Sequence, residues 1–309
     1  MAENDSGRIN KGSIHMFAGK GGVGKTTCAA TTALHYASQG KKTLALSTDA
    51  TPSLAHIFEV SKNGKPTKIK ESLYISELGI NEVEEMWNRK FGREVYQVFS
   101  SIVAIDYDSF VDFMTSMLPG LSDEFIVDYI RELKLGGEYD TIIWDTAPLG
   151  QTLALLQTPA MLVEHLRLAP RIYSKLKISS SREPVLDILK RWQKLSADNI
   201  DFLRSEVDFS LVTIPEALAF EQLEGIFSEL SNFGFGVERL IVNNVVKADD
   251  SEFLMARAEQ QKGYLDMIYE RYSDIEIIEL PMHPREIKGL DRLETIESSL
   301  FRQGDKKAG

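Results

Sequence analysis

The sequence has a single cysteine, Cys28, among its 309 residues. One cysteine excludes an intramolecular disulfide, and it also excludes a zinc or iron–sulfur site built from several cysteines of one chain. No apolar run approaches the ~20 residues that a membrane-spanning helix needs, and the polar start MAENDSGRINKG carries no apolar signal core. We therefore expect a cytoplasmic protein whose membrane contacts would be peripheral.

The chain also lacks an excess of positive charge. It has 46 acidic and 35 basic residues, which gives a net charge of −11. A surface this acidic repels a phosphate backbone, so nucleic acid is not an expected partner. A phosphate-bearing ligand must then be held locally, by backbone N–H groups and a few placed lysines.

Short runs rich in Val, Ile and Leu alternate with helical patterns along most of the chain. This alternation predicts an α/β fold, in which helices cover both faces of a mostly parallel, doubly wound sheet. The expected strands are Ile14–Ala18, Lys42–Ser47, Leu73–Leu78, Thr141–Trp144, Ser210–Ile214, Arg239–Val242 and Ile275–Leu280.

Two stretches, at about 81–135 and 161–206, contain helical patterns but no expected strand. Both fall between strands of the sheet. We therefore expect a single domain over residues 1–309, with these two insertions packing together as a helical subdomain.

A glycine-rich motif follows the first expected strand and opens the first expected helix, Thr26–Gln39. The motif, Gly19-Lys20-Gly21-Gly22-Val23-Gly24-Lys25-Thr26, matches the P-loop pattern G-x-x-x-x-G-K-[ST]. Its glycines let backbone N–H groups point at phosphate, and the helix start adds the positive end of a dipole. The pattern predicts an ATP site over Gly19–Thr27, in which Lys25 binds the β- and γ-phosphates and the Thr26 hydroxyl binds Mg²⁺.

The extra lysine of this motif narrows its class. GKGGVGKTT, with Lys20 before Lys25, resembles the deviant Walker A ATPases. In that class the early lysine reaches across a dimer interface to the nucleotide of the partner. The resemblance implies a homodimer in which Lys20 and Lys25 both serve catalysis.

The segment after the fourth expected strand is more specific still. Asp145-Thr146-Ala147-Pro148-Leu149-Gly150-Gln151-Thr152-Leu153, continuing to Pro159, resembles the second switch of the ArsA-type family. That family contains the arsenite-pump ATPase and the cytosolic ATPase that targets tail-anchored membrane proteins. Further matches are Leu118-Pro119-Gly120 with Glu124, Asn243 in IVNN, and Leu280-Pro281-Met282, so the resemblance runs from about residue 14 to 295.

The resemblance assigns roles residue by residue. Asp49 matches the first-switch aspartate, which orients or deprotonates the attacking water, and a carboxylate there suits in-line phosphoryl transfer. Asp145 matches the aspartate that holds the water shell of Mg²⁺. Adenine would be held by Asn243, Pro281 and Met282.

Two departures from the family pattern matter. The first switch reads Asp49-Ala50-Thr51-Pro52 where the family has D-P-A-H, which leaves the coupling of hydrolysis to dimer opening undecided. The positions of the zinc-binding C-x-x-C clamp are Ser251 and Leu254, so no zinc is expected.

The resemblance favours ATP-driven handling of hydrophobic transmembrane segments, with a membrane receptor or channel as a possible further partner. An arsenite-pump ATPase subunit is the alternative, although one cysteine in a single ATPase half speaks against metalloid binding. A partition or septum-positioning switch is a third class, which the acidic charge and the short polar C-terminus disfavour. An apolar helix stripe is either a client groove or the core of the subdomain: Val103, Tyr107, Phe110, Phe113, Met114 and Met117.

Overall fold

A computed structural model describes residues 14–49, 53–61, 64–93, 96, 100, 104–111, 121–147, 149–173, 182–247 and 251–301. The chain divides into two compact units. The first, called here the nucleotide unit, comprises residues 1–77, 139–149 and 204–309, and the second, called the helical unit, comprises residues 78–138 and 150–203. The prediction of one ATPase domain carrying two insertions stays a prediction.

The nucleotide unit is built on an eight-stranded sheet with the order β3-β4-β2-β5-β1-β6-β7-β8. All neighbouring strands are parallel except the edge pair β3 and β4, which confirms the expected mostly parallel α/β fold. The strands are β1 Ile14–Gly19, β2 Thr43–Ser47, β3 Thr67–Lys70, β4 Leu73–Glu77, β5 Thr141–Asp145, β6 Val207–Thr213, β7 Val237–Val245 and β8 Glu276–Pro281.

Seven of these strands overlap the expected ones, and β3 was missed. Its sequence, TKIK, has only intermediate and exposed side chains. An antiparallel edge strand is buried on one side only, so it lacks the continuous apolar run by which the central strands were recognised. No strand was therefore expected at Thr67–Lys70.

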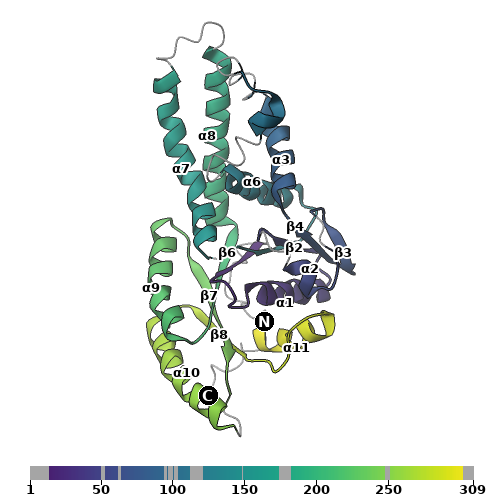
Figure 1. Ribbon diagram of the computed structural model, residues 1–309, viewed down its shortest axis with the longest axis vertical. Coiled ribbons are helices and arrows are strands. Elements are labelled where there is room, and N and C mark those ends of the chain that lie inside the picture. The colour runs from purple at the N-terminus through teal and green to yellow at the C-terminus, as the bar shows by residue number, and fades with distance from the viewer. Residues whose placement is uncertain are drawn as a thin grey trace, which may run out of the picture. The chain divides into compact units, whose positions relative to one another are not determined.

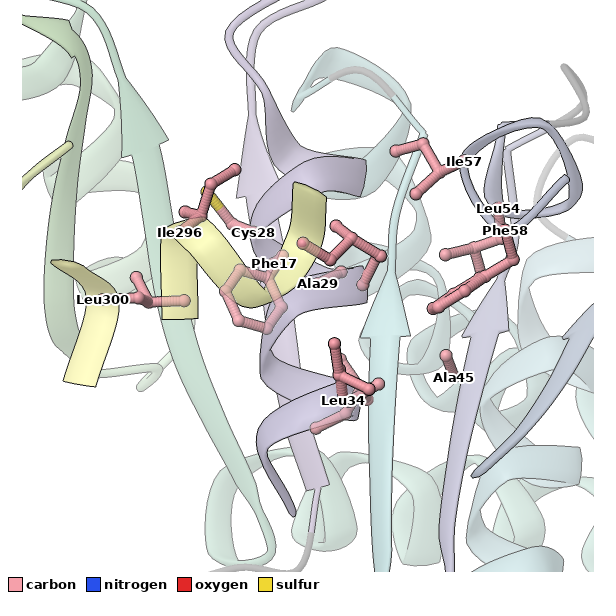
Figure 2. Packing of buried hydrophobic residues seen from close by; sticks show 14 of the residues in the cluster. Phe17, Cys28, Ala29, Leu34, Ala45, Leu54, Ile57, Phe58, Ile296 and Leu300 are labelled. Carbon is pink, nitrogen blue, oxygen red and sulfur yellow. The ribbon is translucent and has the colours of Figure 1, made fainter. Parts of the chain in front are cut away.

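The helices of the nucleotide unit are α1 Lys25–Ser38, α2 Leu54–Ile57, α9 Ala217–Asn232, α10 Glu252–Arg271 and α11 Leu290–Phe301. α1 ends at Ser38, two residues before Gly40, whose φ of 81° is the left-handed conformation that commonly follows the end of a helix. α11 lies along α1, and its Ile296 and Leu300 join Cys28 and Phe17 in one apolar core (Figures 1 and 2). This packing holds α1 against the centre of the sheet.

The helical unit contains α3 Ile80–Trp87, the π-helical segment η1 Asn88–Gly92, α6 Leu121–Gly136, and most of α7 Leu149–Tyr173 and of α8 Arg182–Ser205. Trp87 is fully buried at its centre. Its ring lies 5.7 Å from the ring of Phe125 in α6 and 6.2 Å from that of Trp192 in α8. Aromatic contact thus joins three helices that are far apart in the sequence.

The apolar stripe falls only partly within the described residues. Phe110 is fully buried and packs 6.1 Å from the ring of Trp87, so this member belongs to the core of the helical unit. Tyr107 is partly buried, and its hydroxyl donates to Asn88 Oδ1. The other four members, together with Leu118-Pro119-Gly120, lie outside the described residues.

Candidate functional site

The glycine-rich turn lies at the carboxyl end of β1, between the centre of the sheet and α1. Gly22 and Gly24 have φ values of 79° and 99°, which glycine adopts without strain. A Cβ at Gly19 would meet the carbonyl oxygen of Val212 in β6. Glycine is therefore required for a turn that points successive N–H groups toward an anion.

Lys25 lies over this turn. It is the first residue of α1 and is 6% exposed, and its Nζ donates to the backbone oxygen of Lys20 at 3.0 Å. Burial lowers the pKa of Lys25, while the carboxylates of Asp145 and Asp49 act in the opposite direction. An ammonium group in this place suits the binding of phosphate oxygens.

Asp145 ends β5 and is fully buried. Ser47 Oγ donates to its Oδ2 at 3.3 Å, whereas Oδ1 has no hydrogen-bond partner among the described residues. Burial raises the pKa of Asp145 to about 7, and the Thr26 hydroxyl and the Lys25 ammonium oppose this rise. A buried carboxylate oxygen without a donor, beside a threonine hydroxyl, fits the oxygen ligands that Mg²⁺ prefers.

Mg²⁺ that is carried with ATP takes much of its coordination from phosphates and water, so a few protein oxygens suffice. In the part of the chain that the structure describes, no group of three or more His, Cys, Asp or Glu side chains could hold a metal ion. The oxygens of Thr26 and Asp145 would suit a magnesium ion that arrives with the nucleotide. The assignment of Thr26 and Asp145 to that ion stays a prediction.

Asp49 follows β2 at the same edge of the sheet and is partly buried. Its N–H donates to Ser47 Oγ at 3.2 Å. Next to it, the Thr48 N–H donates to the backbone oxygen of Asp145 at 3.0 Å, and Trp144 Nε1 donates to Thr48 Oγ1 at 3.1 Å. The start of the first switch is thus fixed to the end of β5. Residues 50–52 lie outside the described part of the chain.

The expected adenine residues lie at the carboxyl ends of β7 and β8. Asn243 Nδ2 donates to the backbone oxygen of Val23 at 2.8 Å, a contact with the glycine-rich turn that sequence reasoning did not anticipate. Pro281 pairs with Val245, whose oxygen accepts from the Met282 N–H at 2.9 Å, and Met282 is 43% exposed. The three residues share one sheet edge with the turn, and their roles toward adenine stay predictions.

Two buried polar residues at this edge received no role from the motifs. Ser47 ends β2 and Glu77 ends β4, and the two are paired in register. Their position could have indicated them, because ligands of parallel α/β sheets bind outside the carboxyl ends of the strands. Both residues were overlooked because the P-loop and switch patterns assign no chemistry to them.

Comparison with known proteins gives matches over nearly the whole chain. Residues 13–302 match the model of a family described as anion-transporting ATPase (ArsA_ATPase). A protein of Aquifex aeolicus (strain VF5), named "Putative arsenical pump-driving ATPase 2", is 31% identical over 296 residues, which are 93% of this chain and 98% of its own. The ATPase GET3 of Komagataella phaffii (strain GS115) is 30% identical over 307 residues, 92% of this chain and 88% of its own. ATPase ASNA1 homolog 1 of Paramecium tetraurelia is 29% identical over 299 residues, 89% of this chain and 88% of its own.

Proposed function

Because the chain belongs to the anion-transporting ATPase family and is an ATPase, we propose that it couples ATP hydrolysis to the delivery of hydrophobic membrane-protein clients. It would work in the cytoplasm as a homodimer whose protomers open and close with the nucleotide. Its clients would be tail-anchored proteins, each presenting one transmembrane segment. The membership itself confirms the family that the second-switch sequence indicates.

The observation that carries the hydrolysis step is the meeting of Lys25, Asp145 and Asp49 in one site, where each affects the pKa of a neighbour. Lys25 and the N–H groups of the glycine-rich turn would bind the phosphates. Asp49 would hold the attacking water and accept its proton as the bond to the γ-phosphorus forms and the bond to ADP breaks. Lys20 would act on the nucleotide of the partner protomer.

Thr26 and Asp145 would hold Mg²⁺ and its water shell. The ion, when bound, neutralises charge on the β- and γ-phosphate oxygens. Among the described residues, no helix is both long and apolar enough to cross a membrane. In this proposal the client and a receptor or channel would make the membrane contact.

The name of the Aquifex aeolicus relative favours a second candidate, an ATPase subunit that drives an arsenical pump. Soft metalloids bind thiolates. Cys28 is fully buried behind the glycine-rich turn, and burial raises the pKa of its thiol to about 12. A protonated, inaccessible thiol is a poor ligand for arsenite, which supports the first candidate.

The test compares wild type, Asp49→Asn and a control, Asp140→Asn. Asp140 is exposed at the opposite end of β5, where its Oδ2 accepts from the Lys42 N–H at 2.7 Å. ATPase rate and oligomeric mass are measured with and without a peptide carrying one transmembrane helix. We expect Asp49→Asn to lower kcat about 10²–10⁴-fold and to trap a nucleotide-bound dimer that retains the peptide, while Asp140→Asn behaves as wild type.

Other outcomes separate the candidates. Unchanged turnover in Asp49→Asn contradicts the proposed hydrolysis mechanism. Failure of the peptide to bind, together with faster hydrolysis in the presence of arsenite, favours the pump-driving subunit instead.

A further inference from the structure

Glu77, the last residue of β4, is a buried acid outside the P-loop and switch patterns. It is 1% exposed. Its Oε1 accepts from the N–H of Ala55 at 3.0 Å, and its Oε2 is buried with no hydrogen-bond partner in the described part of the chain. Burying a carboxyl group beneath a four-residue helix costs free energy. The contacts of Glu77 must therefore compensate for this cost.

The acceptor oxygen of Glu77 holds the first turn of α2. Ala55 is the second residue of that helix, and its N–H has no partner within the helix because the first N–H groups of any helix lack one. Glu77 on β4 therefore supplies the missing acceptor. In most helices a side chain at the helix start makes this capping hydrogen bond. Ser53, which precedes α2, makes no such side-chain capping bond.

A second buried side chain holds the other end of the first switch. Ser47 ends β2 and is the register partner of Glu77 on β4. Its Oγ both accepts from the Asp49 N–H and donates to Asp145. Only four residues separate Asp49 from α2. Because a residue spans at most ~3.6 Å, a connection of four residues couples the position of the start of α2 to that of Asp49.

The far end of α2 is fixed as well. The Gly289 N–H donates to the backbone oxygen of Ile57 at 2.8 Å, and His56 Nε2 lies 3.5 Å from a carboxylate oxygen of Glu286. Ile57 also packs in the apolar core of the nucleotide unit. With this end held by the segment before α11, the bond from Glu77 and the buried side chain of Leu54 together hold the end nearer to Asp49.

We propose that Glu77 is a positioning residue for hydrolysis: by holding the first turn of α2, it fixes the end of the first switch and thereby directs Asp49. The inference rests on the proposed function, in which Asp49 orients the attacking water. Glu77 touches neither the phosphate turn nor Lys25 in any contact described above. Its loss should therefore lower kcat while leaving nucleotide affinity intact.

The first experiment measures amide hydrogen exchange in the protein without nucleotide. In Glu77→Ala we expect the Ala55 amide to exchange about tenfold faster, as expected for the loss of one hydrogen bond. Glu77→Gln keeps a carbonyl oxygen in the acceptor position and should exchange as wild type does. Ser76→Ala is the matched control, because Ser76 is equally buried on the same strand but its Oγ donates to Gly64.

The second experiment measures kcat, KM and the Kd of a fluorescent ATP analogue for the same variants. We expect Glu77→Ala to lower kcat about tenfold, with KM and Kd within twofold of wild type. Glu77→Gln should restore most of kcat, and Ser76→Ala should leave all three constants unchanged. If Glu77→Ala does not fold, Glu77→Leu replaces it, since leucine fills a similar volume without an acceptor.

Each result bears on the proposal separately from the proposed function. Unchanged exchange at Ala55 overturns the inference whatever the ATPase does. Faster exchange with unchanged kcat shows that Glu77 holds α2 without directing Asp49, which also overturns it. If Asp49→Asn has no effect but Glu77→Ala still accelerates exchange at Ala55, the mechanism assigned to Asp49 has failed and the positioning role fails with it, while the bond to α2 stands.

Discussion

The nucleotide unit and the helical unit each bury a carboxyl group whose pKa is raised to about 7 by burial, yet the surroundings differ. Asp145 has a lysine ammonium and two hydroxyls nearby. Glu124 is fully buried in the helical unit, where Asn199 Nδ2 donates to its Oε1 at 3.0 Å. The rise in the pKa of Glu124 is opposed most by the Ser196 hydroxyl and by Asn199. The first carboxyl group has an ammonium group beside it, which suits a charge that binds a cation, whereas the second is held mainly by neutral donors that join α6 to α8.

The same contrast holds for the lysines of the two units. Lys25 lies over a turn of backbone N–H groups and forms no salt bridge among the described residues, although the carboxylates of Asp145 and Asp49 raise its pKa from nearby. Lys90 pairs with Asp128 and Glu132 of α6. A cation without a close salt bridge is available to a ligand, whereas a cation enclosed by two carboxylates is structural.

The largest expected effect breaks the helical unit. Trp87→Ala removes the ring that joins α3, α6 and α8, and it should lower the free energy of unfolding by about 3–5 kcal/mol. Urea denaturation followed by circular dichroism measures the loss, and Trp87→Phe should lose less because part of the volume remains. A loss below about 1 kcal/mol in Trp87→Ala would mean that Trp87 is not the centre of this core.

The next effect sharpens the comparison of the two lysines. Lys25→Ala should lower kcat/KM for ATP about 10²–10³-fold, because one preorganised donor to the developing phosphate charge is lost. Lys90→Ala should leave ATP hydrolysis within twofold of wild type and should lower stability. Steady-state kinetics of the two variants, prepared in parallel, provides the measurement, and equal losses of activity would contradict the division of roles.

The third effect concerns the pH dependence of stability. The pKa of Glu124 rises from 4.5 to about 7 on folding, so between these values the folded state binds more protons than the unfolded state. The stability from this group is then fully present below pH 4.5 and is lost as the pH rises through 7, by about 3 kcal/mol. Glu124→Gln should remove this loss. Unfolding by urea at pH 5 and pH 8 tests it, and an identical pH slope in both proteins would refute it.

The smallest effect is expected at Cys28. Because burial raises the pKa of its thiol to about 12, the native protein should not react measurably with a thiol reagent at pH 8, whereas the unfolded chain should react at once. Cys28→Ala should have the ATPase rate of wild type, both with and without arsenite. Rapid labelling of the native protein would reopen the metalloid alternative.

The two units also differ in how far the sequence could predict them. In the nucleotide unit, β1, β2 and β5 are recognisable as continuous apolar runs, because a parallel strand is buried on both faces. β3 was not recognised because it is an edge strand, in which partly buried and exposed side chains alternate. In the helical unit, helical patterns were visible, but the meeting of Trp87 with Trp192 depends on residues more than 100 positions apart, which no local pattern encodes.

The sequence by itself determined the phosphate turn, since glycines and a lysine at fixed spacing permit little else, and it determined the family through a long second-switch match. Only the tertiary structure decided which contacts hold the phosphate turn and the switch residues in place. The bond from Asn243 to Val23, the bond from Ser47 to Asp145, and the bond from Ala55 to Glu77 join residues of different helices, strands and turns. Such contacts arise from the order and register of a sheet, and sheet order is a property of the folded chain that local sequence patterns do not specify.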